Sequence, residues 1–360
     1  MLLRRFDIIP YRLRLVKPLV MKGQTLHERE GLIIRLEDED GFFGLGEVAP
    51  FPGLHRETFL TAATQVAEMK ICLSDRSIPE NLLPMPHLFD DWLGEKKLFP
   101  SVRFGMELAL LNLLADRAKQ PLAALLDPQF RTMVSLNGLF AGGPEELGRE
   151  IPALVAEGYR AIKIKVGRQD LQTEATLVRR TRELAPAVAI RLDANRAWSL
   201  PEALQFGRML GDCRIEYLEE PLRDPAGLGE FHRETTLPLA LDETLDEIFP
   251  NDFSPPPGTA ALILKPGVIG GFEQSIRWAE LARRRQLKVV VSSAFESGVG
   301  LAALANLAAA LNPDDVPCGL DTYKWLAKDV IAHPFRAVNG RVDVAVVDRN
   351  ARQLTVDAER

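Results

Sequence analysis

The sequence predicts an α/β fold in which a closed (β/α) barrel follows a smaller α+β domain. From Met133 onward, strand-like apolar runs alternate with helix-patterned stretches, which is typical of parallel βαβ units. Eight such runs fall within about 190 residues, and this density favours closure into a barrel. A doubly wound open sheet is the alternative, but it does not explain why charged residues stand at the C-terminal ends of so many consecutive strands.

The barrel elements are expected to alternate along the chain. Strands are predicted at 133–140, 161–167, 189–195, 215–221, 237–243, 260–266, 288–295 and 318–322. Helices, where apolar residues recur at helical spacing and Pro or Gly stands at the breaks, are predicted at 145–158, 173–185, 201–210, 272–285 and 300–311.

The first 125 residues have a different pattern, which predicts an α+β domain at 1–125 before a barrel domain at 126–332. The elements expected there are strands at 4–15 and 30–50, the second with a turn at Asp40-Gly41, and helices near 56–73 and 101–119. The tail 333–360 predicts a hairpin that turns at Arg349-Asn350 and completes this domain. The Gly- and Pro-rich stretch 44–57 predicts a surface loop, and such loops often line binding sites.

Length, composition and charge restrict the function. The chain has 360 residues, 46% of them hydrophobic, which suits one large and one smaller domain with a sizeable core. A net charge of −6 and a pI near 5.6 lack the basic footprint of a protein that binds nucleic acid or an anionic membrane. We therefore expect a small-molecule partner.

Cysteine usage and the N-terminal stretch indicate the compartment. Cys72, Cys213 and Cys318 are widely spaced in apolar contexts, which predicts free thiols rather than a disulfide framework or a metal site. Residues 1–15 contain Arg, Asp or Pro every few positions, so they offer neither a signal-peptide core nor a membrane span. We expect a cytoplasmic protein; the sequence leaves the oligomeric state open and is compatible with a monomer.

Three acidic residues end consecutive predicted strands: Asp193 in AIRLDAN, Glu219 in IEYLEEP and Asp242 in LPLALDET. They are separated by 26 and 23 residues, about one βα unit each, so in a barrel they converge on one face. Taken singly, each also suits a helix cap or a loop. Together they suit a hard, six-coordinate divalent cation, with Mg²⁺ as the first candidate and Mn²⁺ as the second.

Lysines flank this acidic set. Lys163 and Lys165, in AIKIKVG, share one face of their strand while its apolar residues share the other. An exposed edge strand is the alternative, but a strand inside a parallel sheet is normally apolar on both faces, so inward lysines indicate a specific use. Lys265, in ALILKPG, ends a later strand, 23 residues after Asp242.

The combination predicts proton abstraction next to a carboxylate. A cation bound to a carboxylate stabilises the charge that develops when the adjacent carbon loses its proton. A lysine whose pKa is lowered by nearby positive charge can take that proton. Lys265, across the barrel, would face the opposite side of the enolate.

The order Lys-x-Lys, Leu-Asp-Ala-Asn, Glu-Glu-Pro, Asp-Glu-Thr and Lys-Pro resembles the enolase superfamily over nearly the whole chain. The resemblance implies a modified (β/α)7β TIM barrel with an N-terminal α+β capping domain. Because a lysine stands at each flank and there is no histidine dyad, the site is more similar to the muconate lactonising branch than to the mandelate racemase branch. Within it, the stretches EGLIIRL, GLGEVAPFPG, IRLDANRAWS and VVVSSAFESGVGL resemble the o-succinylbenzoate synthase family of menaquinone biosynthesis.

This resemblance implies roles for the site residues. Lys165 is expected to remove a proton and then assist loss of the hydroxyl in a syn dehydration, which converts 2-succinyl-6-hydroxy-2,4-cyclohexadiene-1-carboxylate into 2-succinylbenzoate. Lys265 is expected to stabilise the enolate, and Lys163 to lower the pKa of Lys165 and contact the substrate carboxylate. The expected Mg²⁺ ligands are Asp193, Glu219 and Asp242, with Glu220 pointing away.

Substrate contacts are expected nearby. Arg191, which shares the inward face of Asp193, either holds a ligand carboxylate or forms a buried ion pair. The other residues expected to contact the substrate are Asn195, Ser292, Ser293, Pro52 and Gly53.

Other functions stay open. A racemase or epimerase of the same branch, acting on N-acylamino acids or dipeptides, would use the same metal and lysines. Dipeptide epimerases usually carry an Asp-x-Asp pair at the last barrel strand, where this chain has Gly319-Leu320-Asp321, which favours the synthase. A non-catalytic ligand-binding barrel is a remote alternative, because no expected ligand or lysine is missing.

Overall fold

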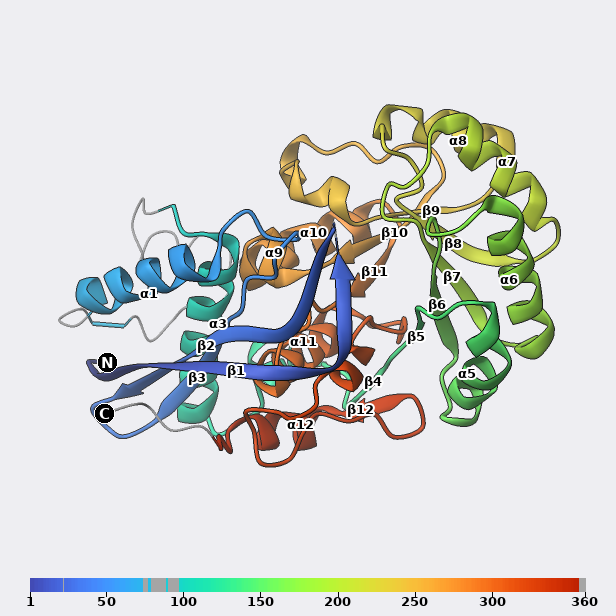
Figure 1. Ribbon diagram of the computed structural model, residues 1–360. Coiled ribbons are helices and arrows are strands. Elements are labelled where there is room, and N and C mark those ends of the chain that lie inside the picture. The colour runs from blue at the N-terminus through green and yellow to red at the C-terminus, as the bar shows by residue number, and fades with distance from the viewer. Residues whose placement is uncertain (22, 74–76, 79–88, 90–96, 356–360) are drawn as a thin grey trace.

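The computed structural model describes residues 1–21, 23–73, 77–78, 89 and 97–355 (Figure 1). Its N-terminal part is an antiparallel sheet in which β2 lies between β1 and β3, with α1 and α3 packed beside it. The bounds are β1 (Leu3–Met21), β2 (Gln24–Asp38), β3 (Phe43–Val48), α1 (Phe59–Leu73) and α3 (Pro100–Arg117). Gly41, with φ +86°, makes the predicted turn between β2 and β3.

The helix α3 joins this cap to the barrel. It lies almost on the backbone of β3, because a Cβ atom on Gly46 would fall 1.9 Å from the carbonyl oxygen of Gly105. Its other side faces the barrel helices, where the rings of Phe104 and Phe272 stack with centroids 5.6 Å apart. Glu107 accepts the backbone N–H of Phe272 at 2.6 Å. The cap is therefore anchored to the barrel through one buried helix.

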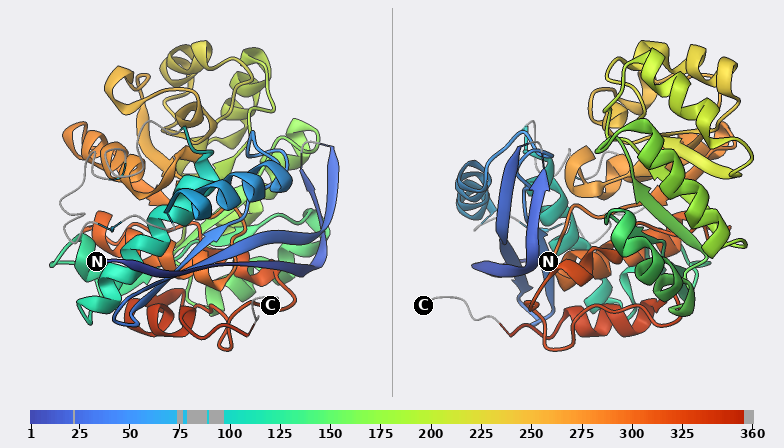
Figure 2. Two further views of the ribbon diagram at one scale, coloured as in Figure 1. Left: turned by 90° about the vertical axis from the view of Figure 1, so that its left-hand side faces the viewer. Right: turned by 45° about the vertical axis from the view of Figure 1, so that its right-hand side comes forward.

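Parallel strands with helices outside form the barrel. Their order is β5-β6-β7-β8-β9-β10-β11, so each strand pairs with the next along the chain. Past β11, Ser292 bridges to Gly319, and Cys318 bridges to Leu136 just before β5, so this segment links the two edges of the sheet. Figure 2 shows the cap on one side and the helix-covered barrel on the other.

The remaining elements, which include those of the barrel, have the following bounds. The strands are β4 (Met133–Ser135), β5 (Gly138–Phe140), β6 (Ala161–Lys165), β7 (Ala189–Asp193), β8 (Ile215–Glu219), β9 (Leu239–Leu241), β10 (Thr259–Leu264), β11 (Lys288–Val291) and β12 (Arg341–Asp343). The helices are α4 (Leu122–Leu126), α5 (Pro144–Ala156), α6 (Leu171–Leu184), α7 (Leu200–Leu210), α8 (Leu228–Thr235), α9 (Pro266–Ile269), α10 (Gly271–Arg284), α11 (Gly298–Leu311) and α12 (Val344–Ala351).

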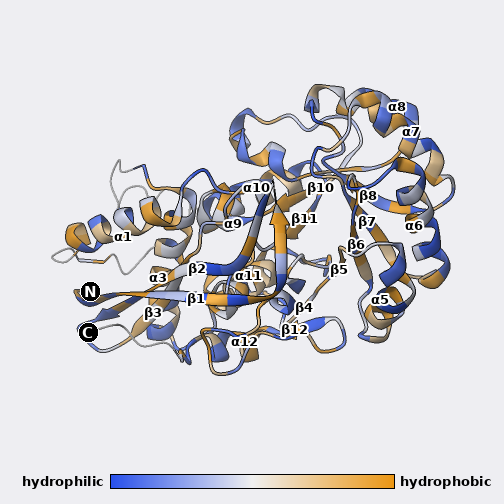
Figure 3. Cartoon of the chain, viewed as in Figure 1, coloured by the Kyte–Doolittle hydropathy of each residue, from blue (hydrophilic) through white to orange (hydrophobic). Residues whose placement is uncertain are grey.

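Local sequence signals start the outer helices. Asp170 caps α6 by accepting the N–H of Thr173 at 2.9 Å, and Ser199 and Glu202 form a capping box at α7. In Figure 3, hydrophobic and hydrophilic residues alternate along α5 to α8. The buried apolar residues of these helices belong to one continuous core with the strands. This amphipathic pattern keeps the helices on the outside of the sheet.

The predicted fold class, an α/β barrel with an α+β cap, is confirmed, but several elements differ from prediction. The stretch 44–57, expected as a surface loop, begins within the buried strand β3. The run 133–140 is two strands, because β4 pairs with β12 in antiparallel fashion and only β5 joins the barrel. Residues 318–322 contribute bridges rather than a strand, since the chain turns into a 3-10 helix at Asp321–Trp325. The tail hairpin is wrong: α12 occupies that place, started by Asp343, which accepts the N–H of Val346 at 3.0 Å.

Two further expectations bear on the site only indirectly. The cysteines form no disulfide within the described residues. Of the helices that the structure describes, none has the length and apolar character needed to cross a membrane.

Candidate active site

Lys163 and Lys165 project from β6 toward the barrel axis. Alternate residues of a strand face opposite sides, and the intervening Ile164 packs in the core instead. The ammonium of Lys163 donates to Oε1 of Glu219 at 2.7 Å and lies 2.8 Å from Oδ2 of Asp193. The ammonium of Lys165 donates to the same Asp193 oxygen at 2.6 Å.

The acidic residues stand side by side at the strand ends. Sheet register pairs Lys165 with Asp193 and Asp193 with Glu219, so the charged groups of β6, β7 and β8 lie in one row. Asp242 follows β9 and accepts a hydrogen bond from Lys265, which follows β10. Each carboxylate in this row is almost completely buried.

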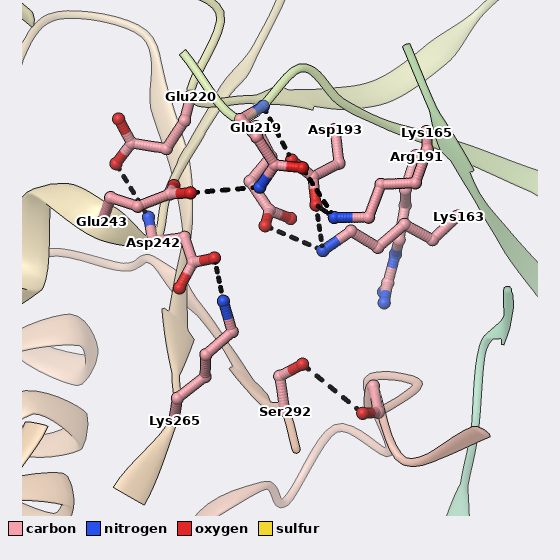
Figure 4. Close-up of polar contacts among 12 residues, drawn as sticks. Lys163, Lys165, Arg191, Asp193, Glu219, Glu220, Asp242, Glu243, Lys265 and Ser292 are labelled. Carbon is pink, nitrogen blue, oxygen red and sulfur yellow. Dashed lines mark hydrogen bonds and ion pairs between the residues drawn. The ribbon is translucent and has the colours of Figure 1, made fainter. Parts of the chain in front are cut away.

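The lysines approach the carboxylates from two sides. In sheet order, β6 and β10 are separated by β7, β8 and β9, the strands that present Asp193, Glu219 and Asp242. Figure 4 shows Lys163 and Lys165 beside Asp193 and Glu219, and Lys265 beside Asp242. A molecule bound against the row would have a lysine at each flank.

Burial and mutual attraction set the charge states. Burial alone would lower the pKa of Lys163, but Asp193, Glu219 and Asp242 outweigh it and hold that pKa well above its ordinary value. Burial would raise the pKa of Asp193, yet Lys163 and Lys165 keep it below its ordinary value. Burial and the neighbouring Asp193 raise the pKa of Glu219 well above its ordinary value and outweigh the opposing effect of Lys163.

At Lys265, burial and neighbouring carboxylates again have opposite effects on the pKa. Burial opposes the charged form, but Asp242 and Glu243 raise the pKa of Lys265 above its ordinary value. Burial and the charge of Asp242 raise the pKa of Glu243. Negative charge is thus concentrated in this part of the barrel.

Glu220 points away from the row and supports it. One of its oxygens accepts the backbone N–H groups of Asp242 and Thr244, at 3.0 and 2.8 Å. The other accepts from Nε of Arg196 at 2.9 Å. The chain leaves β8 at Glu220, whose φ is +40°, so its side chain takes a different direction from that of Glu219.

A cavity of about 320 Å³ opens over the lysines. The cap contributes Leu19 and Val20 from the end of β1 and Leu54 from the loop after β3. The barrel contributes polar and aromatic residues, among them Asn137, Lys163, Lys165, Arg168, Asn195, Glu243, Lys265, Ser292, Ser293, Phe295, Asp321, Thr322 and Trp325. Both parts of the molecule therefore build the site.

The structure separates the expected substrate contacts into two groups. Asn195, Ser292 and Ser293 line the cavity, whereas Pro52 and Gly53 do not, although their neighbour Leu54 does. The cap loop turns there, so that the side chain after Gly53 is the one that faces the site.

Arg191 is also absent from the cavity wall. It is fully buried, with Nε 2.7 Å from Glu216 and Nη1 donating to Asn137 and to the carbonyl oxygen of Pro317. Its position two residues before the strand end places it one layer deeper in the barrel than Asp193. These contacts favour the buried ion pair rather than a ligand contact.

Sequence reasoning missed several lining residues. Glu243 directly follows Asp242, and this adjacency was an available signal. Asp321 was considered only as a departure from a motif, yet it lines the cavity and accepts a hydrogen bond from Tyr159 at 2.5 Å. Phe295 and Trp325 are brought to the cavity by tertiary packing and had no sequence signal.

The side chains of the acidic row offer oxygen donors that could hold a cation. Within the described residues, no three His, Cys, Asp or Glu side chains are gathered as a metal-binding group. The lysine ammonium groups lie between the carboxylates instead. Oε2 of Glu219 and Oε2 of Glu243 are nevertheless buried with no hydrogen-bond partner among the described residues, which is costly for a carboxylate. Oxygen donors of this kind fit a hard divalent cation.

Comparison with known proteins identifies the superfamily of the chain. Residues 146–347 match the family model described as enolase C-terminal domain-like, and residues 3–113 match the model described as MenC, N-terminal domain. The chain belongs to the enolase superfamily.

Curated relatives identify the family of the chain within this superfamily. The chain is 31% identical to the o-succinylbenzoate synthase of Haemophilus influenzae over 358 residues, 98% of both chains. It is 32% identical to the chloroplastic protein PHYLLO of Arabidopsis thaliana over an alignment of 392 residues, which covers 96% of this chain but 23% of PHYLLO. Within the superfamily, the chain belongs to the o-succinylbenzoate synthase family and is an enzyme of the lyase class.

A solved structure shows the same fold. The dipeptide epimerase of Methylococcus capsulatus, complexed with Mg and a dipeptide, has a TM-score of 0.80 with 24% sequence identity. The match covers 95% of this chain and 96% of that one. At this identity the likeness concerns the fold alone.

Proposed function

We propose that this chain dehydrates 2-succinyl-6-hydroxy-2,4-cyclohexadiene-1-carboxylate to 2-succinylbenzoate in menaquinone biosynthesis, with Mg²⁺ as cofactor. The observation that carries this proposal is the placement of Lys165 and Lys265 in one cavity, on strands that flank a row of buried carboxylates. The names of relatives at about 30% identity over most of the chain support the choice of reaction.

Lys165 performs both proton transfers. Neutral Lys165 takes the proton from the ring carbon that bears the carboxylate, and the electron pair moves into that carboxylate as an enolate. Collapse of the enolate expels the hydroxyl of the neighbouring carbon on the same face, and protonated Lys165 returns its proton so that water leaves. The ammonium of Lys265 balances the enolate charge from the other flank.

Lys163 and the acidic row complete the site. Lys163 contacts the substrate carboxylate and adds positive charge beside Lys165. Asp193, Glu219 and Asp242 hold Mg²⁺, and the unpaired buried oxygen of Glu219 supports this assignment. When bound, the ion supplies positive charge that stabilises the enolate.

An epimerase of dipeptides would need a carboxylate free to bind the substrate ammonium. In the segment that closes the barrel, Oδ1 of Asp321 accepts from Tyr159 and pairs with Lys324 at 3.2 Å, while Oδ2 accepts the N–H of Leu139 at 3.2 Å. Asp321 is therefore already engaged on both oxygens. This engagement favours the synthase over the dipeptide epimerase.

The deciding experiment assays purified protein with Mg²⁺ and the cyclohexadiene carboxylate, following formation of the aromatic product. Parallel reactions contain N-succinylamino acids or dipeptides and follow racemisation. We expect efficient dehydration, loss of activity in excess chelator and recovery with added Mg²⁺. Racemisation without dehydration would reassign the substrate, and full activity in excess chelator would remove the metal from the mechanism.

A further inference from the structure

Arg168 lines the catalytic cavity but stays outside its ion pairs. Lys163, Lys165 and Lys265 each pair with a carboxylate. In the part of the chain that the structure describes, Arg168 forms no ion pair; its Nη1 lies 3.5 Å from the carbonyl oxygen of Ala141, at the limit of a hydrogen bond. The cavity thus contains a cation whose charge no described residue compensates.

The backbone beneath Arg168 is held firmly. The buried carboxylate of Glu174 accepts the N–H groups of Gly167, Arg168 and Gln169 at 2.8, 2.7 and 3.0 Å. Gly167 has φ +79°, and a Cβ atom there would lie 2.4 Å from Cβ of Ala197 in the next loop. The loop is therefore fixed while the guanidinium remains exposed, which lowers the entropic cost of binding a ligand.

The cavity wall around Arg168 is apolar. Leu139, Ala141 and Val166 line the same cavity from β5 and the end of β6. An apolar wall that leads to an uncompensated cation suits a short aliphatic chain that ends in a carboxylate. A guanidinium can bind a carboxylate through two parallel hydrogen bonds, which a lysine cannot do.

We propose that Arg168 binds the terminal carboxylate of the succinyl chain and so sets the preference for a dicarboxylic substrate. This inference rests on the proposed function, in which the ring carboxylate of the substrate occupies the Lys163 side of the site. The second carboxylate then needs a cation of its own. Arg168 acts on binding and specificity, and the proton transfers do not involve it.

The test compares two ligands that differ only at the chain end. Binding of 2-succinylbenzoate and of 2-butanoylbenzoate, which lacks the terminal carboxylate, is measured by calorimetry with Mg²⁺ for the wild type, Arg168→Gln and Arg208→Gln. Arg208 is an exposed residue of α7 outside the cavity, so its variant matches the change in charge. KM and kcat for the cyclohexadiene carboxylate are measured for the same proteins, and melting temperatures verify folding.

We expect Arg168→Gln to weaken 2-succinylbenzoate binding roughly 10-fold or more and to leave 2-butanoylbenzoate binding unchanged, because a charge-assisted hydrogen bond is lost for one ligand only. KM should rise by a similar factor with kcat nearly retained, and Arg208→Gln should match the wild type. Equal effects on both ligands, or none, would overturn the role of Arg168 while wild-type turnover kept the proposed function. A wild type that neither turns over the diene nor binds the product would overturn both.

Discussion

Lys163 and Lys165 share a strand face but have different surroundings. The ammonium of Lys163 lies between Asp193 and Glu219, which raises its pKa and makes it a poor base at neutral pH. Lys165 contacts a carboxylate and the neutral amide oxygen of Asn195, at 2.8 Å. This difference in partners supports the proposal that Lys165 abstracts the proton and Lys163 stabilises the charge.

The variant Lys165→Ala should therefore lose turnover by about 10²–10⁴-fold or more, because it removes the base from the reaction. Asp193 keeps Lys163 as a partner, so the melting temperature should change little. The measurement is kcat for the dehydration beside a thermal unfolding curve. Lys288→Ala, which removes a lysine outside the cavity and its ion pair with Glu216, is the control and should keep wild-type turnover. Near-normal turnover by Lys165→Ala would refute the assignment.

Glu220 holds the backbone of Asp242, a proposed ligand of Mg²⁺, so removal of its carboxylate should weaken binding of this ion. Truncation in Glu220→Ala leaves the N–H groups of Asp242 and Thr244 without an acceptor. Partners of this kind usually change metal affinity about 10–100-fold. Titration of activity with Mg²⁺ measures the effect. Glu220→Gln keeps an acceptor oxygen and should retain more affinity; identical titrations for both variants and the wild type would contradict this role.

At the scale of elements, His55 joins the cap loop to the turn after Lys265. Its Nδ1 accepts the N–H of Phe51 at 2.8 Å, and its Nε2 lies 3.0 Å from the carbonyl oxygen of Gly267. These partners require a neutral ring with the proton on Nε2. Burial lowers the pKa of His55 to about 4, against an opposing effect of Glu57. This link between the cap loop and the barrel therefore depends on an unprotonated histidine.

The stability contributed by His55 should depend on pH. The unfolded chain protonates this histidine below about 6.5 and the folded protein only below about 4, so the unfolded state binds more protons between these values. The advantage of wild type over His55→Leu should be full above pH 6.5 and fall by on the order of 3 kcal/mol as the pH drops to 4. Urea unfolding across this range measures the difference. Parallel stability curves for the two proteins would exclude this linkage.

At the scale of the molecule, Arg29 connects the cap loop with the barrel. It is buried and donates to the carbonyl oxygens of Ala49 and Pro50 in the cap and of Phe295 in the barrel. Phe295 itself lines the cavity. Arg29 thus helps to hold the cap over the site, together with α3 and His55.

Replacing Arg29 by Met should cost several kcal/mol of unfolding free energy, because buried carbonyl groups lose their donors at about 1–3 kcal/mol each. KM should rise as well, since the cap loop and Phe295 no longer hold their relative position. Arg35→Met is the control: Arg35 lies on the same strand, and its contacts with Glu37 and Phe43 stay within the cap. Denaturant unfolding and KM are measured together. Equal KM values for the two variants would contradict the role of Arg29 in holding the cap over the site.

Much of the fold and part of the site followed from periodicity. Alternation in β6 separates Lys163 and Lys165 from Ile164, and even spacing brings Asp193 and Glu219 into one row, because these relations are local or repeat with each βα unit. The alternation in 341–351 predicts a strand, but most of this segment forms a helix because Asp343 caps its first turn. The domain limits at 125 and 333, the cytoplasmic location and the oligomeric state stay predictions.

The sequence alone determined the barrel, the family and the order of charged residues along the strands. The tertiary structure decided which charges pair. Arg191 meets Glu216 rather than a ligand, His55 meets Gly267 across 212 positions, and Lys163 is divided between two carboxylates. Residue spacing can place charged residues on neighbouring strands, but which side chains come within pairing distance depends on how the strands and loops pack.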